Sequence, residues 1–137
     1  MPATKKQNKL PTPLEFIARC DMEHAILQRL YADLIVAYNR QFRGKATEKI
    51  LRILSMYVKF HFANEELYME AIHYPEQKHH TQSHTSFAIE LSVIKSLFQK
   101  GDDVYDHIRK LYTSLAQGHI PEDEKLQEYV QCLSPDV

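Results

Sequence analysis

Histidines are unusually frequent in this chain of 137 residues, which has 8 of them beside only 3 glycines and no tryptophan. Two pairs of potential ligands lie four residues apart, His61 with Glu65 and His80 with His84. In an α-helix, this spacing puts two side chains one above the other on the same face. Imidazole nitrogens and carboxylate oxygens placed in this way can chelate a metal ion. The spacing therefore predicts metal binding, provided that these residues lie on helices and face inward.

Apolar residues recur every three or four positions over four segments, which is typical of amphipathic helices. The first segment begins either after the capping box Thr12–Glu15 or at Asp21, and it ends near Asn39. The others are expected over 46–72, 75–100 and 103–119, with Pro121 interrupting the last and a short helical tail over 123–133. Short loops between such helices predict an all-α fold, an antiparallel up-down-up-down four-helix bundle. We expect a single domain over residues 1–137, in which residues 1–12 form a loose N-terminal arm.

The potential ligands occupy positions where the core of a bundle normally has Leu or Ile. In the second helix, for example, His61 and Glu65 continue the stripe of Leu54, Val58 and Tyr68. The residues at such positions are His24, His61, Glu65, His80, His84 and His119.

A buried polar group without a partner costs a few kcal/mol, so these side chains must satisfy one another or share a metal. A single core histidine is more often a hydrogen-bonded structural residue, but that interpretation would have to hold on all four helices at once. More than four ligands, rich in nitrogen, suit two metal ions better than one tetrahedral zinc. His73, His79 and His107 fall off these stripes and are expected to be solvated.

These motifs resemble the hemerythrin family, especially its stand-alone bacterial members. The resemblance runs from Asp21 to Glu124 and rests on Asp21-Met22-Glu23-His24, His61-Phe62-Ala63-Asn64-Glu65-Glu66, Met69, His80, His84 and His119-Ile120. It implies a cofactor of two iron ions joined by an oxo or hydroxo bridge. By that resemblance His80, His84 and His119 would hold one iron. His24 and His61 would hold the other, and Glu65 would bridge the two.

The resemblance also implies a second bridging carboxylate five residues beyond His119. Glu124 stands at that position, whereas the family usually has Asp there. Asp123 would replace it if the backbone register changed. On spacing alone we predict Glu124.

The function that the resemblance implies is reversible binding of molecular oxygen at the iron with only two histidines. Leu27 and Phe62 are the expected walls of the oxygen pocket. Leu115 and Ala116 stand where the family commonly has Trp and Leu. We therefore expect a more open pocket with faster autoxidation, or with room for nitric oxide or peroxide.

Two other classes of function stay open, a redox or stress protein acting on peroxide or nitric oxide, and a sensor of oxygen, redox state or iron. We expect an oxygen-binding or sensing protein rather than an enzyme. The net charge of -1 favours neither nucleic acid nor an anionic membrane. Cys20 and Cys132 match no disulfide framework, and no apolar run could span a membrane, so we expect a cytoplasmic protein. The sequence does not indicate an oligomeric state.

Overall fold

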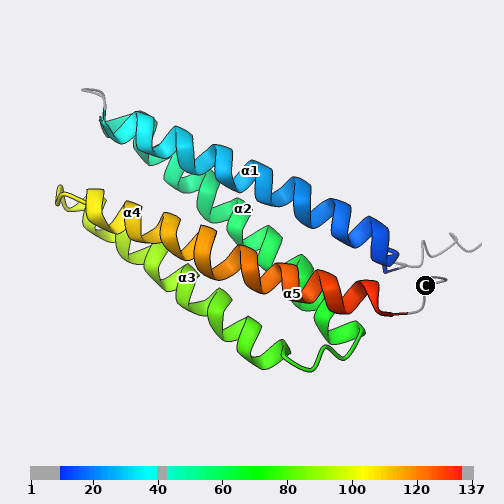
Figure 1. Cartoon of the computed structure of the whole chain (residues 1–137). Coiled ribbons are helices and arrows are strands. Elements are labelled where there is room, and N and C mark those ends of the chain that lie inside the picture. Colours follow the sequence, from blue (N-terminus) through cyan, green and yellow to red (C-terminus); the bar gives the residue numbers. More distant parts are fainter. Residues whose placement is uncertain (1–9, 40–42, 134–137) are drawn as a thin grey trace, which may run out of the picture.

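The computed structural model describes residues 10–39 and 43–133. Three helices are α1 (Pro13–Asn39), α2 (Arg43–Ala71) and α3 (Gln77–Gln99). A fourth rod is built from α4 (Tyr105–Thr113), the π-helical segment η1 (Ser114–His119) and α5 (Ile120–Gln131). In Figure 1 the rods lie side by side, and each runs opposite to the one before it. The predicted all-α, antiparallel four-helix bundle is thus confirmed, while the arm over 1–12 lies mostly outside the described residues.

Each rod packs against two others. α1 contacts α2 on one side and the α4–α5 rod on the other, and α3 likewise contacts α2 and the fourth rod. Four rods in this square arrangement share one long interior, to which every rod presents its inward face. Within the described residues, no helix combines the length and the apolar character that crossing a membrane requires.

Local signals fix where the helices begin and end. The Thr12 hydroxyl donates to the Glu15 carboxylate at 3.1 Å and accepts from the Glu15 amide at 3.2 Å, so the capping box starts α1 and Asp21 lies inside the helix. Gly101 follows α3 with a φ of 84°, the left-handed conformation that ends helices. The Asp103 carboxylate then accepts from the Tyr105 amide at 3.1 Å, where α4 begins.

The fourth rod differs from its prediction in two ways. Pro121 does not interrupt it, because α5 continues directly from the π-helical segment. The wider turns of a π-helix ease the clash between a proline ring and the preceding carbonyls. Tyr105 and Tyr112 share the three- or four-residue spacing of Ile108 and Leu115, which predicts core positions, but they are 38% and 46% exposed, and Leu111 is buried instead.

The apolar core is divided into two clusters. The larger one, which we call the upper cluster, contains Leu27, Tyr31, Leu34, Tyr38, Leu51, Leu54, Val58, Phe62, Phe87, Leu91, Ile94, Val104, Ile108, Leu111 and Leu115. The smaller one, the lower cluster, contains Phe16, Cys20, Tyr68, Met69, Tyr74, Leu126 and Val130. Along α1, α2 and the fourth rod, the histidines and carboxylates of the core lie between these two clusters, and in α3 they lie between the upper cluster and Tyr74, which precedes the helix. A polar layer therefore crosses the bundle between two apolar ones.

Candidate metal centre

Seven buried side chains from all four rods meet in the polar layer. They are His24, His61, Glu65, His80, His84, His119 and Asp123, here called the seven-residue cluster, and each is at most 8% exposed. Among the described residues they form two overlapping groups, in each of which the ligand atoms lie within 4.8 Å of one another. His24 and His61 belong only to the first group, and His80 and His84 only to the second. Glu65, His119 and Asp123 are common to both.

The Asp123 carboxylate lies between the two groups. Its Oδ2 atom is 2.5 Å from Nε2 of His24 and 2.8 Å from Nε2 of His119. Its Oδ1 atom is 2.8 Å from Nε2 of His80. One oxygen therefore faces each group, which is the arrangement of a carboxylate that bridges two cations.

Glu65 approaches the cluster through one oxygen, Oε1. That atom is 3.0 Å from Nε2 of His84 and 3.4 Å from Nε2 of His61. The other oxygen, Oε2, accepts a weak hydrogen bond from the buried Cys20 thiol at 3.9 Å. The thiol thus holds one side of the carboxylate and leaves the other side directed at the histidines.

Several of these atoms are buried without a hydrogen bond to any described residue. They are Oε1 of Glu65, Oδ1 of Asp123, Nε2 of His80, and both ring nitrogens of His84. Such atoms are costly in a protein interior, and all of them except Nδ1 of His84, which lies 3.9 Å from the Glu66 carboxylate, face other ligands of the cluster at close range. Cations between them would satisfy the lone pairs of these inward-facing atoms together. Five imidazoles and two carboxylates are a donor set that suits iron, so the residues fit a metal centre.

The electrostatics keep two of the imidazoles, those of His84 and His119, available as ligands. Burial, together with neighbouring His119 and His80, lowers the pKa of His84 to about 2. Burial also lowers the pKa of His119. Both rings are therefore neutral at pH 7, the state in which histidine binds metals.

The pKa values of the two carboxylates in the cluster are shifted in opposite directions. Burial and the nearby Asp123 charge raise the pKa of Glu65 well above its ordinary value. Burial would raise the pKa of Asp123 as well, but hydrogen bonds to His119, His24 and His61 outweigh it and hold this pKa well below the ordinary value. Asp123 is thus charged in the metal-free chain, whereas Glu65 tends to hold a proton.

Glu23 supports the cluster from outside and was missed in the sequence. Its side chain is 2% exposed, and its Oε1 atom is 2.7 Å from Nδ1 of His61. Asn64 donates to the other oxygen at 3.4 Å. A carboxylate behind a ligating histidine fixes the ring and strengthens it as a donor. Its spacing could have revealed it, because Glu23 lies three residues after Cys20 and four before Leu27, on the core stripe of α1.

The structure corrects the prediction for the second carboxylate. Glu124 is exposed, and Asp123, 0% exposed, lies in the cluster instead. A five-residue spacing from His119 needs a wide turn between the two residues. The π-helical segment ends at His119, so regular α geometry follows, and there it is the residue four positions on that shares a face.

The four predicted pocket residues lie beside the cluster in different ways. Leu27, Phe62 and Leu115 belong to the upper cluster, while Ala116 is partly exposed. Phe62 stacks on the His84 ring, with centroids 3.9 Å apart and planes at 4°, and lies 5.8 Å from the His61 ring. Phe62 therefore covers the group that contains His84 more closely than the group that contains His61.

Comparison with known proteins agrees with this geometry. The chain is 29% identical over 105 residues to the bacteriohemerythrin of Stenotrophomonas maltophilia, a match that covers 77% of this chain and 68% of that protein. It is 31% identical over 74 residues to the bacteriohemerythrin of Campylobacter jejuni, covering 54% of this chain and 56% of that protein. No family model and no solved structure matches the chain.

Histidines and carboxylates from four rods in one buried layer are the arrangement in which helical bundles hold metal ions. Together with this geometry, the two bacteriohemerythrins support an assignment of the chain to the hemerythrin family.

Replacing either Asp123 or Glu124 with its amide separates the roles of these two adjacent residues. Asp123→Asn removes the charge that faces both groups, so we expect the metal content to fall by at least one ion per chain. Glu124→Gln makes a similar change of charge on the exposed face and should leave the metal content unchanged. Metal analysis of both purified variants tests this, and equal losses in the two would contradict the assignment.

Metal binding at pH 7 should release protons. The raised pKa values of Glu65 and His61 mean that the metal-free chain holds protons there, which a cation must displace. His84 and His119 contribute none because they are already neutral. We expect on the order of one proton per chain, and affinity that falls as pH is lowered because protons compete with the cation. Titration with Zn²⁺ in weak buffer and an indicator dye measures this, and binding without proton release would contradict it.

Proposed function

We propose that the chain binds two iron ions in the seven-residue cluster, and binds molecular oxygen or a related small ligand reversibly at that centre. The observation that carries this proposal is the pair of overlapping ligand groups sharing Glu65, His119 and Asp123, in which several buried ligand atoms have no hydrogen bond to any described residue. A bound ferrous pair would supply the electrons that reversible oxygen binding requires.

The uneven division of the imidazoles supports a place for a ligand. Five histidines cannot be shared equally between two ions. If His119 joins His80 and His84, as the resemblance suggests, the ion beside His24 and His61 has one protein ligand fewer. An ion with fewer protein ligands keeps a position for a small molecule.

The surrounding side chains would protect such a position from water. Leu27 is 1% exposed and follows His24 by one helical turn, and Leu115 is 3% exposed one turn before His119. Both belong to the upper apolar cluster. Apolar walls exclude water and so slow the side reactions that end reversible binding.

Reversible oxygen binding can be tested by reconstituting the metal-free chain with Fe²⁺ under anaerobic conditions and admitting air. We expect a visible absorption band that disappears under vacuum and returns with air over repeated cycles. His24→Ala should lose the band, whereas His107→Ala, which changes an exposed histidine outside the cluster, should keep it. A band that appears once and bleaches irreversibly would contradict reversible binding.

A second candidate is redox chemistry on peroxide or nitric oxide, which the Glu23–His61 contact favours. The buried Glu23 carboxylate adds negative charge behind a ligand, and negative charge stabilises more oxidised metal ions. Iron supported in this way would lose electrons more easily, which suits redox turnover of a substrate better than reversible oxygen binding.

Removing that charge should separate the two candidates. We expect Glu23→Gln to slow autoxidation of the ferrous protein by about 10-fold. Glu70→Gln, at an exposed position of α2, is the matched control and should oxidise at the wild-type rate. Autoxidation is followed by visible absorption. If Glu23→Gln oxidises as fast as the control, the charge of Glu23 does not promote redox chemistry.

A further inference from the structure

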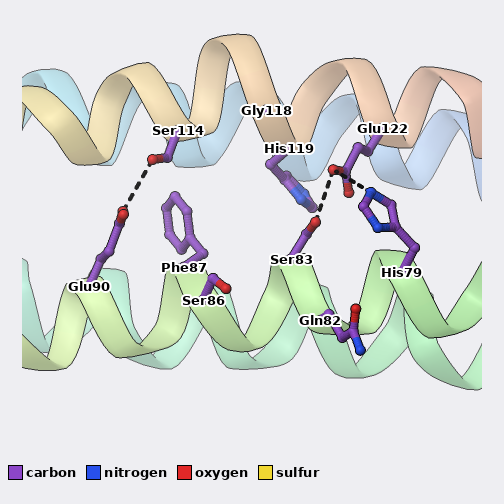
Figure 2. Close-up of a pocket in the computed structure, with 10 residues that line it drawn as sticks. All are labelled: His79, Gln82, Ser83, Ser86, Phe87, Glu90, Ser114, Gly118, His119 and Glu122. Atoms are coloured by element: carbon purple, nitrogen blue, oxygen red, sulfur yellow. Dashed lines mark hydrogen bonds and ion pairs between the residues drawn. The ribbon is translucent and has the colours of Figure 1, made fainter.

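A groove of about 380 Å³ runs between α3 and the fourth rod and reaches the seven-residue cluster at His119 (Figure 2). His79 and Ser83 line it from α3, and Gly118 and Glu122 line it from the opposite rod. His119 is the member of the cluster that borders this groove. The groove therefore borders the proposed metal centre at one of its ligands.

Among the described residues, Glu122 is one of two glutamates that line the groove. Its Oε1 atom accepts a hydrogen bond from the Ser83 hydroxyl at 2.9 Å and lies 3.7 Å from Nε2 of His79 (Figure 2). Its Oε2 atom is buried and accepts no hydrogen bond from any described residue. A carboxylate oxygen in this situation gains most from a cation.

The rest of the lining favours a positive ion over other ligands. A second carboxylate, Glu90, accepts a hydrogen bond from Ser114 at 3.1 Å, and no Lys or Arg is among the described residues that line the groove. Two carboxylates repel anions and attract cations. Oxygen ligands with one imidazole suit a hydrated divalent cation. Six waters occupy roughly 200 Å³ at about 30 Å³ each, so a hexahydrated ion fits.

We propose that this groove is the entry route for ferrous iron, an inference that rests on the proposed metal centre. Glu122 and His79 capture the hydrated cation near the surface. The ion then passes to His119 and Asp123, which lie three residues before and one residue after Glu122. The ligands of the cluster are at most 8% exposed, so a cation needs such a path unless the bundle opens.

The role of the Glu122 charge in metal entry is tested by measuring the rate of metal loading. The metal-free full-length chain is mixed with Co²⁺, and the visible absorption of bound cobalt is followed by stopped flow. We expect Glu122→Gln to load roughly 3- to 10-fold more slowly, with a difference that shrinks at high salt. Glu124→Gln is the matched control, because it makes the same change two residues away on the exposed face. It should load at the wild-type rate.

A steric variant tests the same route without changing charge. A Cβ atom added at Gly118 meets no other atom within 4 Å, so Gly118→Ala should fold and load normally. Gly118→Leu puts a larger side chain into the groove and should slow loading at least as much as Glu122→Gln. Its final metal content should equal that of Gly118→Ala.

The final metal content distinguishes a failure of the proposed entry route from a failure of the proposed metal centre. Slow loading in both Glu122→Gln and Gly118→Leu, with unchanged final content, supports the route. Wild-type rates in either variant overturn the route and leave the metal centre intact. A lower final content in Glu122→Gln also overturns it, because Glu122 would then be a ligand. Failure of the wild-type chain to bind Co²⁺ at all contradicts the proposed centre itself.

Discussion

The dominant constraint on this bundle is the burial of five imidazoles and two carboxylates in one layer of its core. Each of these groups loses its hydration on folding, and several of them regain no hydrogen bond from the described residues. Apolar side chains would fill the same space at much lower cost. Cations bound in this layer would compensate the cost of burying these groups, and their binding free energy would add directly to the stability of the fold.

The remainder of the molecule holds this layer in place. The upper and lower apolar clusters lie on either side of it, so all four rods are fixed where they deliver a ligand. Cys20 and Glu23, both 1% exposed, then orient Glu65 and His61 from behind. Supporting contacts of this kind decide the direction of a ligand's lone pair as much as the backbone does.

Much of this arrangement could be predicted because helical periodicity is a local property. His61 with Glu65 and His80 with His84 are recognisable as inward-facing pairs from spacing alone. The choice between Asp123 and Glu124 was not predictable in the same way, because it depends on where the π-helical turns lie. A change of helix type rotates every following side chain, and nothing in the residues around Pro121 specifies it locally. Glu23 was overlooked because charged residues at core positions are rare and its partner His61 lies 38 residues away.

Occupation of the polar layer by two metal ions is tested most directly by anaerobic titration of the metal-free chain with ⁵⁷Fe²⁺, with Mössbauer spectra recorded before and after oxidation. We expect saturation at two iron ions per chain, with two coupled ions of unequal coordination after oxidation. Saturation at one ion per chain, or two magnetically independent ions, would contradict a shared centre bridged by Glu65 and Asp123.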